Sequence, residues 1–160
     1  MDFKLKHLVV TKDMPCGFIT PVPRVIPYKD DLVQLYDSVV YKSKNGGIWV
    51  APRGWITDGA SIPWILTWKY KRFDPRYVRS AFIHDVRFTI HDLSFADSNT
   101  LFLESMRWEA WHKANLFYRA VSTPFGWWNY HMHPGPAENE SLYAEIEDIK
   151  EYFENMLEEK

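Results

Sequence analysis

Three polar residues in otherwise apolar helical segments are the strongest candidates for chemistry. His84 and Asp85 are adjacent within the apolar run 80–86, and Asp97 lies in the next predicted helix. Each needs a partner, because burying an unpaired imidazole or carboxylate costs several kcal/mol. If the two helices pack antiparallel, Asp97 can approach His84. A carboxylate that holds a histidine fixes its tautomer and raises its basicity. We therefore predict that His84 and Asp97 form a catalytic pair, hydrogen-bonded directly or through one water.

A fourth candidate, Asp58, lies in the loop 54–61, whose sequence is Gly-Trp-Ile-Thr-Asp-Gly-Ala-Ser. Small residues allow the backbone to come close to a ligand. The loop could therefore present backbone groups and the Asp58 carboxylate to a ligand or an ion. If it belongs to the same site as the helices, Asp58 should lie near Asp85 or His84. If Asp58 lies elsewhere, the loop is a turn that shapes the backbone.

Each candidate also has a structural interpretation. Adjacent helix residues point about 100° apart, so His84 and Asp85 cannot simply bond each other. His84 could be a core histidine whose hydrogen bonds are satisfied, and Asp85 could cap the preceding loop. Asp97 follows Ser94 by three residues, a spacing that also fits a helix capping box.

Other motifs are weaker. His131 and His133 alternate along the chain and could bind a metal, but no third ligand is evident. The chain has no P-loop, Rossmann fingerprint or H-E-x-x-H motif. The single cysteine, Cys16, excludes an internal disulfide, a cysteine zinc cluster and a Cys-x-x-Cys redox pair.

The elements that position these residues change in type after about residue 57. Before that point, β-branched and aromatic residues predict strands, and Asn45-Gly46 predicts a hairpin turn between the last two. Beyond it, caps and apolar spacing predict helices, except for an aromatic loop at 127–134. The expected strands are 5–11, 32–42 and 48–51, and the expected helices are 74–91, 94 to about 108, 113–121 and 141–158.

These elements predict an α+β fold, in which a small antiparallel sheet from the N-terminal third packs against three or four helices. The chain has 160 residues, of which 46% are apolar and 25% charged, as expected of one globular domain. We expect residues 1–136 to form a single α+β domain and residues 137–160 to form an acidic amphipathic helix after it.

The charge of the chain is unevenly distributed. Residues 137–160 contain nine acids and two lysines and carry −7, whereas the rest carries +5. The basic charge is not concentrated in a stripe, so we expect no direct nucleic-acid binding. Apolar runs are too short for a transmembrane segment, and the N-terminus lacks the apolar stretch of a signal peptide. We therefore expect a soluble protein that is not exported by the general route.

The C-terminal helix has an apolar stripe that must be covered, and either its own body or a neighbouring subunit could cover it. We favour a partner chain, which predicts self-association through this helix. The stripe consists of Leu142, Ile146, Ile149, Phe153, Met156 and Leu157.

The sequence resembles an uncharacterised bacteriophage and prophage family of unknown function. Its pattern is approximately V-P-x-G-F-x-T-D-G-A-S-I-P, then H-D-x-x-Y, then R-x-x-A-D-x-x-F. Residues 48–63, 81–85 and 95–97 carry the similarity, which extends roughly over 32–126. The chain departs from the pattern at Phe88, Ser94 and Leu101. The resemblance implies a phage origin, other phage proteins as partners, and a location in the host cytoplasm during infection or in the virion.

The spacing of the polar residues is also similar to that of phospholipase A2, which places H-D-x-x-Y on one helix and a second Asp on the next. That similarity implies that His84 is the base, Asp97 orients it, and Asp85 binds a divalent cation such as calcium. The loop 57–61, with Asp58, would then correspond to the calcium loop. Phe88 in place of Tyr and the absence of disulfides are departures from those enzymes.

Two classes of function remain open. One is a hydrolase with a His-Asp centre, with or without a divalent cation, that acts on a phospholipid or another ester. The other is a non-catalytic virion or tail component, in which the same residues form a buried polar network that fixes the core.

Overall fold

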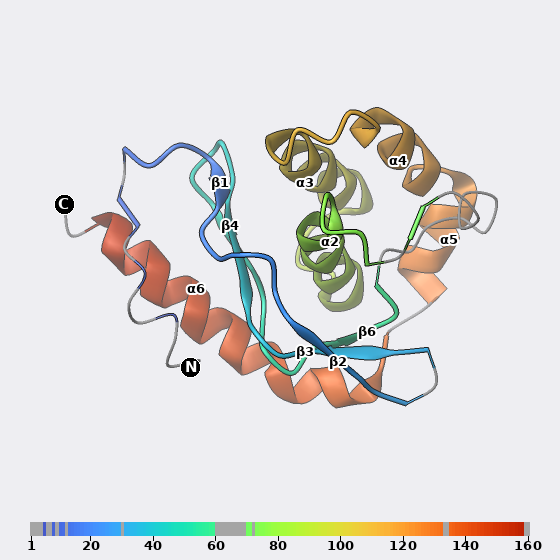
Figure 1. Ribbon diagram of the computed structural model, residues 1–160, viewed down its shortest axis with the longest axis horizontal. Helices are drawn as coiled ribbons and strands as arrows, with labels where there is room; N and C mark the ends of the chain where they lie inside the picture. Colours follow the sequence, from blue (N-terminus) through green and yellow to red (C-terminus); the bar gives the residue numbers. More distant parts are fainter. Residues whose placement is uncertain are drawn as a thin grey trace.

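The computed structural model describes residues 5, 8, 10–11, 13–29, 31–59, 70–71, 73–132 and 135–158. In this part of the chain the strands precede the helices (Figure 1), which confirms the α+β class. The strands are β1 (Gly17–Phe18), β2 (Val25–Pro27), β3 (Val33–Leu35), β4 (Val39–Lys42), β5 (Ile48–Ala51) and β6 (Ile56–Thr57). The helices are α2 (Val78–Ile90), α3 (Phe95–Trp108), α4 (Ala114–Val121), α5 (Pro124–Met132), the 3₁₀ helix η2 (Ala137–Leu142) and α6 (Tyr143–Glu158).

The strands form two small antiparallel sheets, in the orders β1-β4-β5 and β2-β3-β6, in place of the single sheet that we predicted. The predicted strand 32–42 divides into β3 and β4 because polar residues bend the chain between them. At this bend Asp37 accepts hydrogen bonds from Arg24, and Ser38 accepts one from the backbone of Arg53. The predicted strand 5–11 is wrong at positions 5, 8, 10 and 11, and its other residues lie outside the described part.

The predicted hairpin turn is confirmed between β4 and β5. Ser43 N donates to Gly47 O at 2.9 Å, and Asn45 Oδ1 accepts from Gly47 N at 3.2 Å. Gly46 has a φ of 88°, which a residue with a Cβ rarely adopts. The turn therefore sets the register in which Val40 pairs with Val50.

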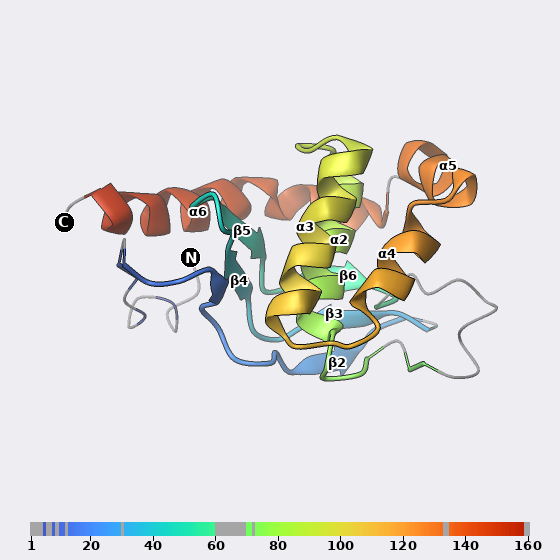
Figure 2. The ribbon, with the colours of Figure 1, turned by 90° about the horizontal axis from the view of Figure 1, so that it is seen from above.

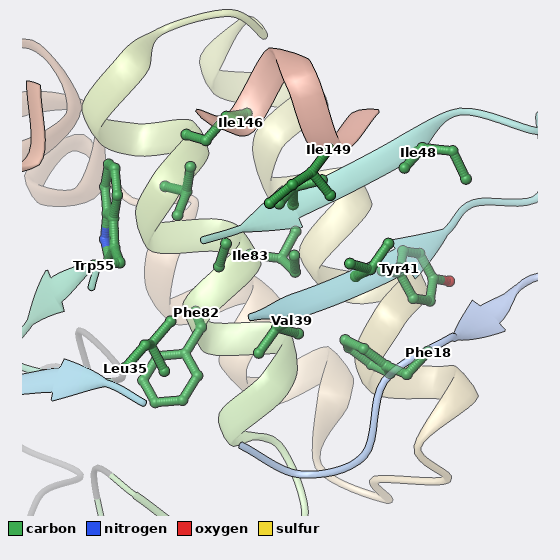
Figure 3. Close-up of a cluster of buried hydrophobic side chains, with 14 of the residues drawn as sticks. Phe18, Leu35, Val39, Tyr41, Ile48, Trp55, Phe82, Ile83, Ile146 and Ile149 are labelled. Atoms are coloured by element: carbon green, nitrogen blue, oxygen red, sulfur yellow. The ribbon is translucent and has the colours of Figure 1, made fainter. Parts of the chain in front are cut away.

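The main core surrounds β4 and β5, which lie between α2 and α6 (Figures 1 and 3). All four residues of β4 are buried, as expected of a strand covered on both faces. Ile83 of α2 packs from one side, and Ile146 and Ile149 of α6 pack from the other. This arrangement fixes α2, the helix that contains His84 and Asp85.

A second core cluster joins α2 to α3 and α4. It contains Tyr77, Phe102, Met106, Trp111 and Phe117. Figure 2 shows α2 and α3 side by side, and these two helices share an extensive interface. The first cluster therefore packs α2 against the sheet, and the second packs it against α3 and α4.

Two helix predictions need correction. The first predicted helix starts at Val78 because residues 74–77 form a turn, in which the Asp74 carboxylate accepts hydrogen bonds from Arg76. The second correction is α5, which includes most of the predicted aromatic loop. Thr123 Oγ1 accepts a hydrogen bond from Gly126 N, and Pro124 occupies the first helical position, where its missing N–H costs nothing.

The apolar stripe of α6 packs on its own chain. Ile146, Ile149 and Phe153 are buried in the same cluster as Val50 and Trp55. The expectation that a partner chain covers this stripe is therefore wrong for its buried residues, which the body of the same chain covers. No helix in the described part combines the length and the apolarity needed to cross a bilayer.

Candidate functional site

His84 is sealed between α2 and α3. Its ring lies between those of Phe88 and Phe102, with centroid distances of 4.0 and 4.4 Å. Its Nε2 donates a hydrogen bond of 2.8 Å to Asn99 Oδ1. Burial lowers the pKa of His84 from 6.5 to about 4, and the hydrogen bond with Asn99 offsets part of that change. The ring is therefore neutral at physiological pH and faces aromatic side chains.

Asp97 does not pair with His84, so the predicted hydrogen bond between them is wrong. Asp97 is exposed at the start of α3, where its backbone N donates to Ser94 Oγ at 3.1 Å. Ser94 Oγ in turn donates to Asp97 Oδ2 at 2.6 Å. The alternative interpretation of this pair as a helix cap is confirmed.

Asn99 takes the place that we assigned to Asp97, and sequence reasoning missed it. The two residues are about 200° apart around the helix, so only one of them can face α2. Asn99 is three residues before Phe102 and seven before Met106, which are both core residues. That spacing was the available signal, because it places Asn99 on the buried face.

Asp85 faces away from His84 and toward the sheet. Trp55 Nε1 donates to Asp85 Oδ2 at 2.9 Å, and Trp55 itself is fully buried. Burial raises the pKa of Asp85 from 3.8 to about 7, and the negative charge of Asp58 adds to this increase. Hydrogen bonds from Trp55 and Thr57 act in the opposite direction and favour the ionised form.

Asp58 lies beside Asp85, which confirms the predicted proximity of the two carboxylates. Both line one pocket of about 300 Å³ that is open to solvent. The pocket lies between β6, α2, α5 and the segment before η2. Its described lining is Leu32, Ile56, Thr57, Asp58, Asp85, Phe88, Thr89, Asn129, Gly135 and Pro136. His84 is absent from this lining, so the four candidates lie in three places: His84 in a sealed interface, Asp97 at an exposed helix cap, and Asp58 and Asp85 in the open pocket.

Two contacts fix the segment that carries Asp58. On one side β6 pairs with β3, with Thr57 opposite Val33. On the other side the buried Asn139 accepts a hydrogen bond of 2.8 Å from Ile56 N and donates one of 2.9 Å to Ile56 O. The Asn139 side chain therefore makes the pair of backbone hydrogen bonds that a neighbouring strand would make. Sequence reasoning missed this residue because no local pattern in the acidic C-terminal segment marks it as buried.

The pocket offers oxygen atoms to a cation. Hydroxyl, amide and carboxylate groups come from Thr57, Asp58, Asp85, Thr89 and Asn129. Calcium prefers six to eight such oxygen ligands, whereas the described residues contain no cluster of three His, Cys, Asp or Glu side chains. A cation held here would depend on the two carboxylates and on neutral oxygens. The His131 ring packs at a tilt against Trp127, and His133 lies outside the described residues.

Together, the fold and the site define an α+β protein with two carboxylates in an open pocket. The chain belongs to the family described as "Protein of unknown function (DUF1353)", whose model matches residues 33–121. This confirms that the chain belongs to an uncharacterised domain family, whereas a phage origin stays a prediction. The matched region contains His84, Asn99, Asp58 and Asp85, but not Asn129. Comparisons with curated proteins and with solved structures give no match.

Proposed function

We propose that the protein is a phage-encoded hydrolase whose active site is the pocket with Asp58 and Asp85. The observation that carries this proposal is the convergence of two carboxylates from different elements on one open pocket, one of them largely buried. In this proposal Asp85 replaces His84 as the group that exchanges a proton. His84 is poorly suited to that role because its ring is sealed and paired with Asn99.

Asp85 has the properties of a general base. A general base works best when its pKa lies near the working pH, and that of Asp85 is about 7. Trp55 and Thr57 hold the carboxylate by hydrogen bonds, and it lines the pocket, where it can accept a proton from a water molecule. Asp58 raises the basicity of Asp85 through its negative charge. The substrate class that we propose is an ester, including the phospholipid esters.

The proposal includes a divalent cation such as calcium as a ligand of the same pocket. Asp58 would hold it, with neutral oxygens from Thr57 or Asn129, next to the Asp85 carboxylate that exchanges the proton. When bound, such an ion would polarise the carbonyl or phosphoryl oxygen of an ester. It would also favour the ionised form of Asp85 and so lower the pKa of that group.

The test is hydrolysis of a chromogenic ester panel and of phospholipid, with and without calcium. Asp85→Asn and Asp58→Asn keep the shape of each side chain and remove its charge. We expect Asp85→Asn to reduce the rate by about 10²-fold or more, the usual contribution of a positioned base. Asp148→Asn, which removes an exposed carboxylate from α6, is the matched control and should leave the rate unchanged. A rate that Asp85→Asn leaves intact would contradict the proposal.

A second candidate function is a non-catalytic virion or tail component, and the sealed pairing of His84 with Asn99 favours it. A neutral histidine between two phenylalanine rings fixes how α2 packs on α3 without any chemistry. In this case purified phage particles should contain the protein, and the Asp85→Asn variant should still assemble. Its absence from particles would contradict this candidate.

A further inference from the structure

One face of α5 exposes large apolar side chains. Phe125 is 66% exposed, Trp127 is 51% exposed, and Trp128 and Met132 are each 53% exposed. Phe125, Trp128 and Met132 follow one another at three- and four-residue steps and therefore share a face of the helix. Isolated exposed apolar residues are common, but three on one face of a nine-residue helix, with Trp127 exposed at the adjacent position to Trp128, indicate an interaction site. We call these four residues the α5 patch.

The other face of α5 is firmly packed, so the exposure does not reflect a loosely placed helix. Tyr130 OH donates a hydrogen bond of 2.6 Å to Leu93 O, and the Tyr130 ring packs edge-on against Phe88. Gly126 is buried so close to α4 that a Cβ there would lie 1.8 Å from Val121 O. The α5 patch is therefore presented to solvent by a fixed support.

The stretch of sequence that contains α4 and α5 lacks acidic residues, although Asp58 and Asp85 line the adjacent pocket and the charge of Asp92 acts on Tyr130. Residues 110–137 contain no Asp or Glu, although the whole chain has 21, and they include Lys113, Arg119 and three histidines. Arg119 and Leu116, which is 40% exposed, are an exposed basic and an exposed apolar side chain of α4, the helix that packs against α5. Figures 1 and 2 show α5 at one end of the molecule and the C-terminal end of the acidic helix α6 at the other.

We propose that the α5 patch docks the protein on an anionic lipid surface. Trp and Phe side chains favour the interfacial zone of a bilayer, and basic residues beside them are attracted to anionic headgroups. The distribution of charge turns α5 toward such a surface and the acidic end of α6 away from it. A protein partner would also cover an apolar patch, but the absence of acidic side chains from α4 and α5, together with Lys113 and Arg119, favours a lipid headgroup layer. This inference goes beyond the proposed function and does not depend on it, because binding requires no turnover.

Docking would place the carboxylate pocket at the lipid surface. Asn129, which lines the pocket, belongs to the same helix as the α5 patch. It follows Phe125 by four residues and is therefore a neighbour of the patch on the helix surface. A phospholipid bound by the α5 patch would thus be close to Asp85 and Asp58.

The test is co-sedimentation of the full chain with two kinds of vesicle. One contains phosphatidylglycerol mixed with phosphatidylcholine, and the other contains phosphatidylcholine alone. We expect stronger binding to the anionic vesicles, weakened by added salt. The double variant Phe125→Ser, Trp128→Ser should bind at least about tenfold more weakly, because two large apolar side chains no longer enter the interface. Arg119→Glu changes only an exposed charge and should weaken binding to the anionic vesicles alone.

The matched control is Ile26→Ser, which removes an exposed apolar side chain of β2 and should bind like the unaltered chain. Circular dichroism checks that each variant folds. If the double variant does not fold, Arg119→Glu still tests the proposal. The proposal is overturned if the unaltered chain binds neither vesicle, or if Ile26→Ser weakens binding as much as the patch variants. It is also overturned if light scattering shows a dimer that the double variant dissociates.

Discussion

Trp55 Nε1 lies 2.9 Å from Asp85 Oδ2 and donates a hydrogen bond to it. The two residues come from opposite sides of the site, since Trp55 precedes β6 and Asp85 belongs to α2. The indole has a single N–H donor, so it fixes one carboxylate oxygen of Asp85, and a hydrogen bond from Thr57 adds to this support. This contact explains how a carboxylate that is mostly removed from water keeps a defined orientation beside Asp58. It also joins the loop with Asp58 to the helix with Asp85.

The first prediction concerns the pH dependence of stability. The folded pKa of Asp85 is raised from 3.8 to about 7, so its contribution to the free energy of unfolding decreases as the pH rises from about 4 to 7. The folded pKa of His84 is lowered from 6.5 to about 4, so its contribution increases with pH over nearly the same range. The two effects oppose each other, and variants are needed to separate them.

Urea denaturation between pH 4.5 and 7.5 measures the free energy of unfolding of the unaltered chain and of each variant. Relative to the unaltered chain, Asp85→Asn should gain stability as the pH rises. The variant lacks the carboxyl group whose contribution to the free energy of unfolding decreases over this range. His84→Gln should show the opposite trend relative to the unaltered chain. Parallel curves for all three proteins would mean that neither group has a shifted pKa.

The second prediction distinguishes Asn99 from Asp97 as the partner of His84. Asn99→Leu removes the acceptor and leaves a buried N–H of His84 without a partner, which should cost about 1–3 kcal/mol of stability. Asp97→Asn changes an exposed residue at a helix cap and should cost less than about 0.5 kcal/mol. Thermal or urea unfolding of both variants checks this difference. A larger loss for Asp97→Asn would restore the pairing predicted from the sequence.

The third prediction concerns Asn139, which holds the edge of β6. Asn139→Ala removes two buried hydrogen bonds to the backbone of Ile56 and should cost about 2–4 kcal/mol. Asn115→Ala is the matched control, because Asn115 is exposed and its amide oxygen accepts a hydrogen bond from the exposed Arg107, which should contribute little. Equal losses in urea denaturation would show that Asn139 does not support the strand.

The sequence predicted the parts of this structure that depend on local physical chemistry. The Asn45-Gly46 turn, the cap at Ser94 and the amphipathic C-terminal helix each follow from residues within one or two turns of chain. The proximity of Asp58 and Asp85 was also predicted, as a condition on the loop belonging to the site. The role of each carboxylate stays a prediction.

Other features depended on tertiary contacts that no local pattern contains. Asp97 and Asn99 are both polar residues in the same helix, and only the packing of α2 on α3 decides which of them meets His84. The sequence also left open what covers the apolar stripe of α6. The same pattern of apolar residues is expected whether the rest of the chain or a partner chain packs on it. The segment at 127–134 was interpreted as a loop because the cap provided by Thr123 was overlooked.

The most direct test of the account is the pKa of Asp85 itself, measured by carbon-13 NMR titration of its carboxyl group. In the unaltered chain we expect a pKa of about 7. Asp58→Asn should lower this pKa, because it removes the like charge from the pocket. Trp55→Phe should raise it, because the ionised form loses a hydrogen-bond donor. An Asp85 carboxyl that titrates near 3.8 in all three proteins would contradict a coupled carboxylate pair in this pocket.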